Sequence, residues 1–215
     1  MIDGLHWLGH DSFRIDGSCV VYVDPWKLPP GAPSADLILV THEHFDHFSI
    51  EDIRKIAVPG TSVVGPQSVA SQLAGEEILT VIAVSAGDVV TAGSAVIAAV
   101  PAYNVDKYRS PGELFHPREA GGVGYVVDLD GRRIYHAGDT DAIPEMRGVD
   151  CDIALVPVGG TYTMTVEEAA SACSFLDAAL VVPMHYGDIV GRHSDALRFA
   201  ELCRLPVAIL PVDRA

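Results

Sequence analysis

The chain has 215 residues and a formal net charge of −15, and 49% of its residues are apolar. A surface this acidic disfavours nucleases and other nucleic-acid-binding proteins, because their affinity comes mostly from Lys and Arg that neutralise phosphates. No apolar run approaches the roughly 20 residues that span a bilayer, and the N-terminus has no apolar signal core, so we expect neither a membrane span nor an export signal. The four cysteines are scattered without a C-x-x-C pair, which is typical of reduced thiols and predicts a cytoplasmic protein.

The first half of the chain predicts short strands joined by turns, followed by alternating strands and helices. GLHWLG, SFRID and CVVYVD are β-rich, and the apolar segment 36–40 is typical of a strand covered on both faces. Ser49 predicts the N-cap of a short helix that Pro59-Gly60 ends. A strand at 61–65 and a helix at 66–74 follow, and then three strands near residues 78–84, 88–91 and 95–100.

The second half begins with residues 101–122, a long polar segment rich in Gly and Pro that is typical of a functional or mobile loop. Asp130-Gly131 predicts a hairpin turn, and Thr165 with Glu168 predicts a capping box. Ser194 predicts the start of another helix, and strands are expected at 151–158, 180–184 and 207–212. This order favours one α/β domain, residues 1–215: a four-layer αββα sandwich of two mixed β-sheets flanked by helices.

The stretch THEHFDHFS, which begins at Thr41, concentrates metal-ligand side chains directly after a predicted buried strand; they are His42, His44, Asp46 and His47. Imidazole and carboxylate are the ligand types of catalytic zinc, and no thiolate lies nearby in the sequence. Asp139 in HAGDT and His185 in PMHYG also follow predicted strands. Sites in α/β sheets gather beyond the carboxyl ends of strands, so these three segments predict one metal site.

These motifs together resemble the metallo-β-lactamase superfamily: H-x-H-x-D-H at 42–47, GDT with Asp139 and MHY with His185. The opening WLGHDSFRI, the VDPW around Asp24 and the string HAGDT are similar to its branch of ascorbate-6-phosphate lactonase and N-acylphosphatidylethanolamine phospholipase D. The resemblance runs from about His6 to about Gly187 and implies a two-metal site at the seam of two sheets.

The resemblance also implies a role for each residue. It implies that His42 and His44 bind metal one, that Asp139 bridges the metals, and that metal two is held by Asp46, His47 and His185. Asp46 and Asp139 are the catalytic candidates that accept or relay a proton. Asp24 is expected to orient a ligand histidine, and His10 either edges the cavity or joins two strands. The expected cofactor is zinc, one or two ions, with Mn or Fe as alternatives.

One position departs from the family pattern. The family supplies a third histidine to metal one from the strand before Asp139, and the matching strand end offers Asn104 instead. Asn is a weak zinc ligand, and His116 in the long loop is a candidate to replace it. Metal one is therefore expected to be weak, absent, or completed when this loop closes.

The expected activity is metal-dependent hydrolysis of a small anionic ester, lactone or phosphodiester by an activated water. Four residues are candidate substrate contacts, three of them basic, a charge that suits phosphate or carboxylate; they are Lys107, Arg109, Arg118 and Tyr162. Two alternatives are open: a di-iron redox protein, and a non-catalytic metal- or ligand-binding module with an incomplete first site. A homo-oligomer is compatible with the sequence, but no feature of it requires one.

Overall fold

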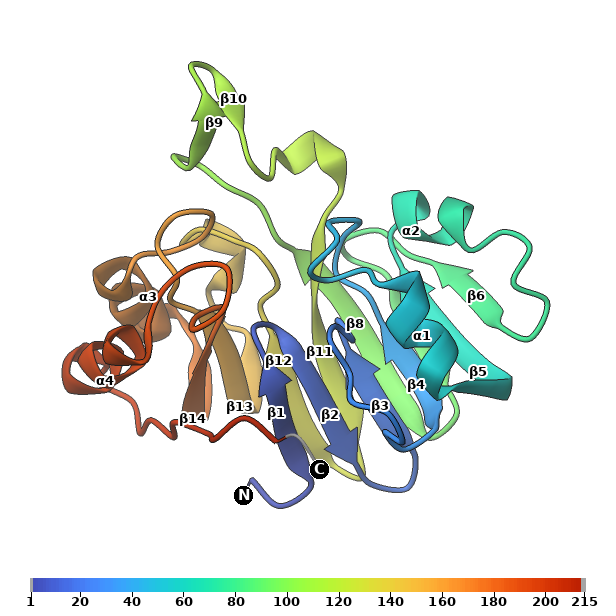
Figure 1. Cartoon of the computed structure of the whole chain (residues 1–215). Helices are drawn as coiled ribbons and strands as arrows, with labels where there is room; N and C mark the ends of the chain where they lie inside the picture. Colours follow the sequence, from blue (N-terminus) through green and yellow to red (C-terminus); the bar gives the residue numbers. More distant parts are fainter. Residues whose placement is uncertain (1, 214–215) are drawn as a thin grey trace.

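Two six-stranded β-sheets pack face to face, with helices on their outer surfaces (Figure 1). The structure is a computed structural model that describes residues 2–213. In the first sheet β1 to β3 are antiparallel and β3 to β6 are parallel. Its strands, in spatial order, are β1 Leu5–Gly9, β2 Ser12–Asp16, β3 Val20–Val23, β4 Ala35–Leu39, β5 Ala57–Gly65 and β6 Thr80–Ala83.

The second sheet has the same mixed character. Its strands from β7 to β12 are antiparallel, and those from β12 to β14 are parallel. In spatial order they are β14 Asp177–Met184, β13 Asp150–Pro157, β12 Arg132–His136, β11 Val123–Leu129, β8 Ala95–Pro101 and β7 Val89–Ala92. The predicted αββα arrangement of two mixed sheets is confirmed.

Period-two alternation along the strands gives each sheet two covered faces. In β4, Leu37 and Leu39 point into the core between the sheets, whereas Ile38 packs under the helices of the first sheet. Those helices are α1 Ile50–Ile56 and α2 Gln67–Gln72, and the second sheet carries α3 Val166–Ala172 and α4 His193–Leu202. Short 3₁₀ turns lie at Arg118–Ala120, Pro144–Met146 and Cys173–Phe175.

Hydrogen bonds join the two sheets where the metal motif begins. The buried Tyr125 hydroxyl of β11 donates to the carbonyl of Val40, at the end of β4, over 2.7 Å. The next residue, Thr41, accepts from the amide of Val123 at 3.0 Å. The loop that follows β4 is therefore attached to both sheets, which fixes its position at the seam.

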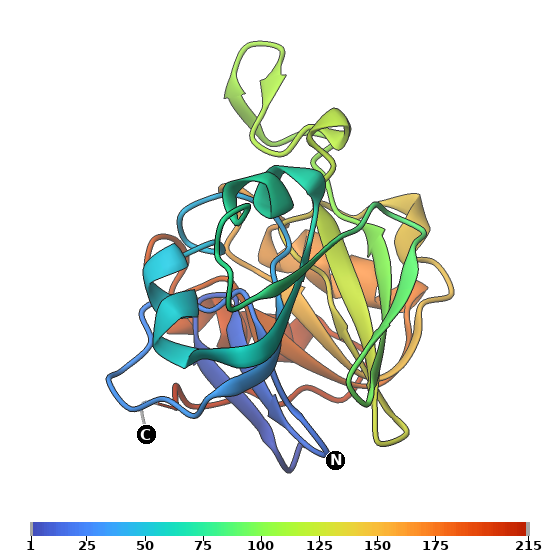
Figure 2. The same ribbon diagram turned by 90° about the vertical axis from the view of Figure 1, so that its right-hand side faces the viewer.

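The long polar segment contains a small hairpin of its own, β9 Tyr108–Ser110 with β10 Glu113–Leu114. This hairpin projects from one end of the molecule, beyond the two sheets (Figures 1 and 2). It pairs with neither large sheet. Its return arm brings His116 back to the body of the protein, because His116 and Asn104 bond across its base.

Three sequence predictions of element boundaries are wrong. Helix α1 ends at Ile56, and β5 runs through Pro59-Gly60, so that pair ends no helix. Helix α4 begins at His193, with Arg192 rather than Ser194 in the cap position. The predicted strand 207–212 forms only isolated bridges at Val207 and Val212. Proline lacks the N–H that a ladder needs, and the segment has prolines before and within it.

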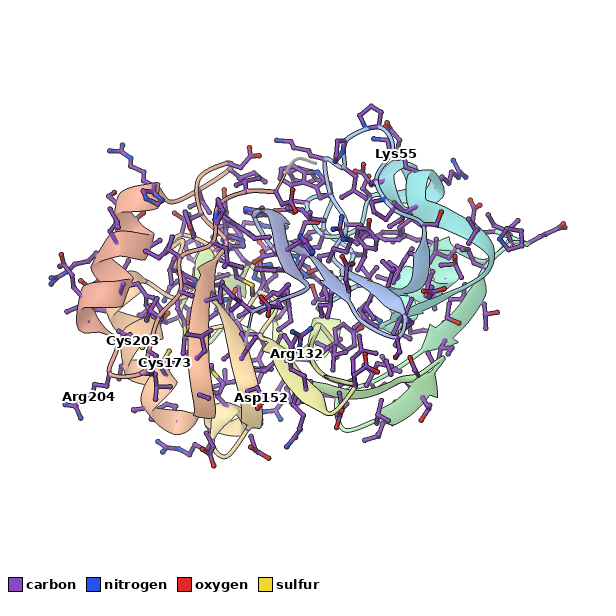
Figure 3. All side chains as sticks on the ribbon, turned by 90° about the horizontal axis from the view of Figure 1, so that it is seen from below. Lys55, Arg132, Asp152, Cys173, Cys203 and Arg204 are labelled. Atoms are coloured by element: carbon purple, nitrogen blue, oxygen red, sulfur yellow. The ribbon has the colours of Figure 1, made fainter. Side chains whose placement is uncertain are left out.

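All four cysteines are free. Cys173 and Cys203 lie close together beside α3 and α4 (Figure 3), with a hydrogen bond between their thiols. Among the described residues, no helix combines the length and apolar character needed to cross a membrane.

Candidate metal centre

The loop between β4 and α1 turns sharply so that its ligand-type side chains face one place. The carbonyl of His44 accepts from the amides of His47 and Phe48, at 3.0 and 2.8 Å. Ser49 then caps α1 by accepting from the amide of Asp52. His42 and His47 are buried, His44 and Asp46 are half-buried, and Phe45 points outward with 69% of its side chain exposed.

Three histidines form the first cluster. His42 Nε2 lies 3.0 Å from His44 Nδ1, and His116 Nε2 lies 3.1 Å from the same atom. Two ligand atoms that share one zinc at about 2.1 Å lie about 3.0–3.4 Å apart, so this spacing fits a shared ion. Burial, and then His47, hold the pKa of His42 well below its ordinary value, and burial lowers that of His116 to about 4. These imidazoles therefore offer neutral nitrogens at neutral pH.

Asn104 does not join this cluster, although its sequence position matches the family's third histidine. Its Oδ1 accepts from the backbone amide of His116 at 2.8 Å and from Nδ1 of His116 at 3.0 Å. An amide oxygen only accepts, so the His116 proton is on Nδ1 and the lone pair of Nε2 faces the cluster. The Asn104 amide also donates to Asp141 and to the carbonyl of Tyr162. The structure thus places His116 among the ligand-type side chains and Asn104 behind it.

The second cluster surrounds Asp139. Its Oδ1 lies 3.4 Å from His47 Nε2, and its Oδ2 lies 3.3 Å from His185 Nε2 and 3.2 Å from His116 Nε2. Asp139 therefore contacts both clusters. Asp46 lies on the other side, with Oδ2 at 3.8 Å from His47 Nε2.

Backbone geometry that only certain residues tolerate positions these side chains. Gly138 precedes Asp139 with φ +65°, and a Cβ there would lie 2.8 Å from the carbonyl of Val123. His185 itself has φ 60°, a strained value that a non-glycine residue keeps only where its surroundings hold it. Gly159 lies against His185, and a Cβ on it would lie 2.3 Å from the His185 carbonyl. Side chains larger than glycine at positions 138 and 159 would therefore collide with neighbouring backbone.

In the second cluster the charges of the histidines and of the carboxylates shift one another's pKa values. Burial lowers the pKa of His185, but Asp139 and Asp11 outweigh it and raise that pKa to about 9. Burial acts on His47 in the same way, and Asp139 and Asp24 bring its pKa well above the ordinary value. Burial raises the pKa of Asp46, but a hydrogen bond from His10 and the charge of His47 lower it to about 2. The carboxylates of the second cluster therefore stabilise positive charge there.

Three buried atoms that face each other in the second cluster lie 3.3–3.4 Å from a neighbouring ligand atom, but none has a hydrogen bond of good geometry among the described residues: His47 Nε2, His185 Nε2 and Asp139 Oδ1. Buried polar atoms are nearly always hydrogen-bonded, so each exception calls for an unseen partner. Nitrogen and carboxylate oxygen together are ligands of zinc and of first-row divalent ions. The residues therefore fit a bound metal ion.

Asp24 and His10 lie directly behind these side chains. Asp24 Oδ2 accepts from Nδ1 of His47 at 2.8 Å and from the hydroxyl of Thr41 at 2.7 Å. This bond leaves Nε2 of His47 free to face Asp139. His10 Nε2 lies 3.1 Å from Asp46 Oδ2, and the backbone carbonyl of His10 accepts from the amide of His185 at 3.1 Å. His10 thus both edges the cluster and joins two segments.

Sequence reasoning missed Asp11, which is fully buried beside the second cluster with 0% exposure. Its Oδ2 lies 3.5 Å from His47 Nε2 and 3.7 Å from His185 Nε2. Burial raises the pKa of its carboxyl group. The sequence offers only a weak signal for it: Asp11 lies in the short turn between the apolar strands GLHWLG and SFRID, and an acidic residue in such a turn is usually exposed.

The basic residues of the long loop divide into two groups. Lys107 pairs with Asp141 and Glu168, and Arg118 pairs with Glu145 at 2.8 Å. Neither lines the cavities beside the histidines. Arg109, in contrast, lines a cavity of about 240 Å³ that opens over the clusters. Aromatic and aliphatic side chains make up much of its wall, namely Phe45, Phe115, Tyr162 and Ile189.

Comparison with known proteins gives consistent similarities. The model of the beta-lactamase superfamily domain matches residues 4–185. A UPF0173 metal-dependent hydrolase of Aeropyrum pernix is 34% identical over 213 residues, covering 91% of this chain and 87% of that protein. One of Thermoplasma acidophilum is 35% identical over 208 residues, covering 91% and 88%.

Solved structures agree with these relatives. A protein of Parabacteroides distasonis that carries the designation metal-dependent hydrolase superposes with a TM-score of 0.83 at 32% identity, over 97% of this chain and 93% of that one. CmlA, a diiron β-hydroxylase of Streptomyces venezuelae, superposes with a TM-score of 0.73 over 97% of this chain and 52% of that one. At 17% identity the second similarity concerns the fold alone.

Proposed function

The chain belongs to the metallo-β-lactamase superfamily of metal-dependent hydrolases, and from that premise we propose that it holds two metal ions and hydrolyses a small anionic ester, lactone or phosphodiester. The observation that carries the proposal is the group of buried, unpartnered ligand atoms around Asp139. Left without a cation, such atoms would cost about 1–3 kcal/mol each, and more where a charge is involved. Bound metal ions would supply the partners that these ligand atoms lack.

We assign metal one to the first cluster and metal two to the second. The first set is His42, His44 and His116; Nδ1 of His44 lies 3.0 Å from Nε2 of His42 and 3.1 Å from Nε2 of His116. The second set is Asp46, His47 and His185, and Asp139 contacts both sets and bridges them. In this assignment His116 supplies the ligand that the sequence lacks at Asn104, and Asn104 orients it.

When bound, two metal ions at these clusters would lower the pKa of a water and polarise the substrate's carbonyl or phosphoryl oxygen. The protein's own side chains do the rest. Asp46 has a pKa of about 2, so it stays ionised at every working pH and holds positive charge in place. Its Oδ2 accepts a hydrogen bond from His10 Nε2 at 3.1 Å, which holds the carboxylate in its charged form.

The cavity above the metals suits a small substrate with one anionic and one apolar part. Arg109 is exposed at its rim, and its side chain comes no closer than 3.9 Å to a carboxylate, that of Glu113. It is therefore available to a phosphate or carboxylate. Phe115 and Tyr162 meet edge to face with ring centroids 4.8 Å apart and form the apolar wall. Arg109 and Tyr162 are the substrate contacts in this proposal, and Lys107 and Arg118 stabilise the loop.

Metal content and hydrolysis test the proposal together. Protein purified without chelator should contain about two equivalents of metal and hydrolyse members of a panel of nitrophenyl esters, lactones and phosphodiesters. Asp139→Ala should lose both properties, whereas His193→Ala, which alters an exposed histidine outside both clusters, should keep them.

Other outcomes favour the remaining hypotheses. A coloured protein with iron and no hydrolysis would favour the redox alternative. One tightly bound ion with no turnover over the panel would favour a binding module. An Asp139→Ala variant with full activity would contradict the proposed site.

A further inference from the structure

We propose that Asp11 is an additional carboxylate ligand of the ion in the second cluster and gives that ion an oxygen-rich, six-coordinate site. The inference rests on the proposed two-metal function and deepens it. It assigns a role to a residue outside the ligand set described above. It also predicts which ion the second cluster prefers.

The turn between β1 and β2 holds Asp11 in a fixed place. The β1–β2 pairing is irregular between Trp7 and Gly9, and such bulges re-aim the side chains that follow. His10 then has φ 51°. The carbonyl of His10 accepts from the Trp7 indole and from the amide of His185, at 2.9 and 3.1 Å. The carbonyl of Asp11 accepts from Nε2 of His136 at 2.9 Å. With its backbone held on both sides, Asp11 points in one direction.

That direction is into the second cluster, where Asp11 has no hydrogen-bond donor. Its exposure is 0%, and neither carboxylate oxygen has a hydrogen-bond partner among the described residues. A buried carboxylate without a partner costs several kcal/mol even after the protein relaxes. Removing the charge, or supplying a cation, would relieve that cost.

The nearest candidate cations are histidines, but they are placed as ligands rather than as donors. Asp11 Oδ2 lies 3.5 Å from His47 Nε2, 3.7 Å from His185 Nε2 and 4.0 Å from His10 Nε2. Distances of about 3.6 Å or more are too long for hydrogen bonds. Ligand atoms about 2.1 Å from one ion lie about 3.0 Å apart at an angle of 90° and about 3.6 Å apart at 120°. The two shorter distances lie near the larger value, so an octahedral ion would draw these atoms together by about 0.5–0.7 Å.

His47 shows the difference between the two kinds of carboxylate. On its Nδ1 side Asp24 lies at 2.8 Å and accepts a hydrogen bond. On its Nε2 side Asp11 and Asp139 lie at 3.5 and 3.4 Å without one. A ligand imidazole has this pattern, with an outer partner on one nitrogen and the ion's other ligands around the second nitrogen.

Adding Asp11 changes the kind of ion that the cluster suits. Asp11, His47, Asp139 and His185 form one group whose ligand atoms lie within 4.8 Å of one another, and Asp46 forms a second such group with His10 and the same two histidines. If Asp46 turns to the same ion, the cluster offers two imidazoles and three carboxylates. With one water or substrate atom this makes six ligands, and most of them are oxygens. Zinc prefers four ligands in a tetrahedron, whereas oxygen-rich octahedral sites suit Mn²⁺ and Fe²⁺. We infer that Asp11 shifts the second cluster towards Mn²⁺ or Fe²⁺.

The test is a metal titration of wild type, Asp11→Asn and Asp52→Asn. Asp11→Asn preserves the shape and removes the charge. Asp52 is another buried carboxylate, which accepts from the amides of Lys27 and Leu28 and from the ammonium of Lys55, so its variant controls for loss of a buried charge elsewhere. Free Mn²⁺ is followed by its paramagnetic resonance signal, and zinc is followed by competition with a chelator.

We expect two equivalents in wild type and in Asp52→Asn. In Asp11→Asn one equivalent should bind Mn²⁺ at least about 100-fold more weakly, since loss of an outer partner alone costs about 10–100-fold. Zinc should lose less, because four ligands remain. A folded Asp11→Asn variant with wild-type affinity for both Mn²⁺ equivalents would overturn the inference while leaving the two-metal function intact.

Two further outcomes are decisive. If wild type binds no metal, the proposed function and the inference both fail. If Asp11→Asn does not fold, Asp11→Ala replaces it. If neither folds, X-ray absorption of wild type with two equivalents of Mn²⁺ decides. An average first shell of about six nitrogen and oxygen ligands, with carboxylate carbons in the next shell, supports Asp11, and a shell of four overturns it.

Discussion

Asn104→Ala tests whether Asn104 acts by holding His116 rather than as a ligand itself. The variant removes an oxygen that accepts from the His116 amide at 2.8 Å and from its Nδ1 at 3.0 Å. The amide is buried, and leaving it unpaired should cost about 1–3 kcal/mol of unfolding free energy. The His116 ring also becomes free to rotate and to change tautomer. Loss of such outer partners lowers metal affinity about 10–100-fold, so metal one should weaken by that factor.

The assay is calorimetric zinc titration of four proteins: wild type, Asn104→Ala, His116→Ala and the double variant. If Asn104 acts through His116, adding Asn104→Ala to the His116→Ala variant should change the affinity of metal one very little. The affinity of metal two should stay within a few-fold of wild type throughout. Equal losses from Asn104→Ala with and without His116 would refute the reasoning, because they would make Asn104 an independent ligand.

Three further predictions concern other parts of the chain. Gly159→Ala should displace His185, because the new Cβ would lie 2.3 Å from the His185 carbonyl oxygen. We expect the free energy of unfolding in urea to fall by about 1–3 kcal/mol and metal two to bind more weakly. Unchanged metal binding would contradict this. In chelator the raised pKa values of His47 and His185 should stabilise the fold fully below about pH 6.5. The contribution of His185 should be lost as the pH rises through about 9, visible as a falling Tm. A flat Tm between these values would argue against it. A hydrogen bond from Cys173 lowers the pKa of Cys203 to about 7 (Figure 3), so iodoacetamide should alkylate Cys203 first, with a midpoint near that pH; equal rates at the four thiols would contradict it.

The sequence carried most of the fold because local signals and the tertiary structure agree. The alternation in β4 serves two cores at once, and the capping box at Thr165 is present as predicted. The prediction of a strand at 207–212 was wrong because the hydrophobic pattern takes no account of the amide hydrogens that proline lacks. Its residues touch both sheets without extending either ladder.

The candidate site was predictable only where ligand-type residues follow a strand in the sequence. His42 to His47, Asp139 and His185 share that signal. His116 does not: it lies after a hairpin, and hydrogen bonds to Asn104 bring it back. Asp11 lies in a two-residue turn, and its environment is created by segments far along the chain. Such residues are identified by where other segments pack, which periodicity and spacing do not contain.

The two clusters are electrostatically different, and that difference should set the order in which they fill. The pKa of His116 is about 4, so an ion entering the first cluster displaces no proton there at neutral pH. An ion entering the second must displace the proton of His185, whose pKa of about 9 makes this cost about 3 kcal/mol at pH 7. It must also displace the proton of His47, whose pKa Asp139 and Asp24 raise against the effect of burial. The carboxylates of Asp46 and Asp139 offset these costs, and the part due to His185 vanishes above about pH 9. Affinity for metal two should therefore rise steeply between pH 6 and 9, while that for metal one stays nearly constant. A zinc titration repeated across this range would show it, and two affinities that move in parallel would mean that the clusters share one proton equilibrium.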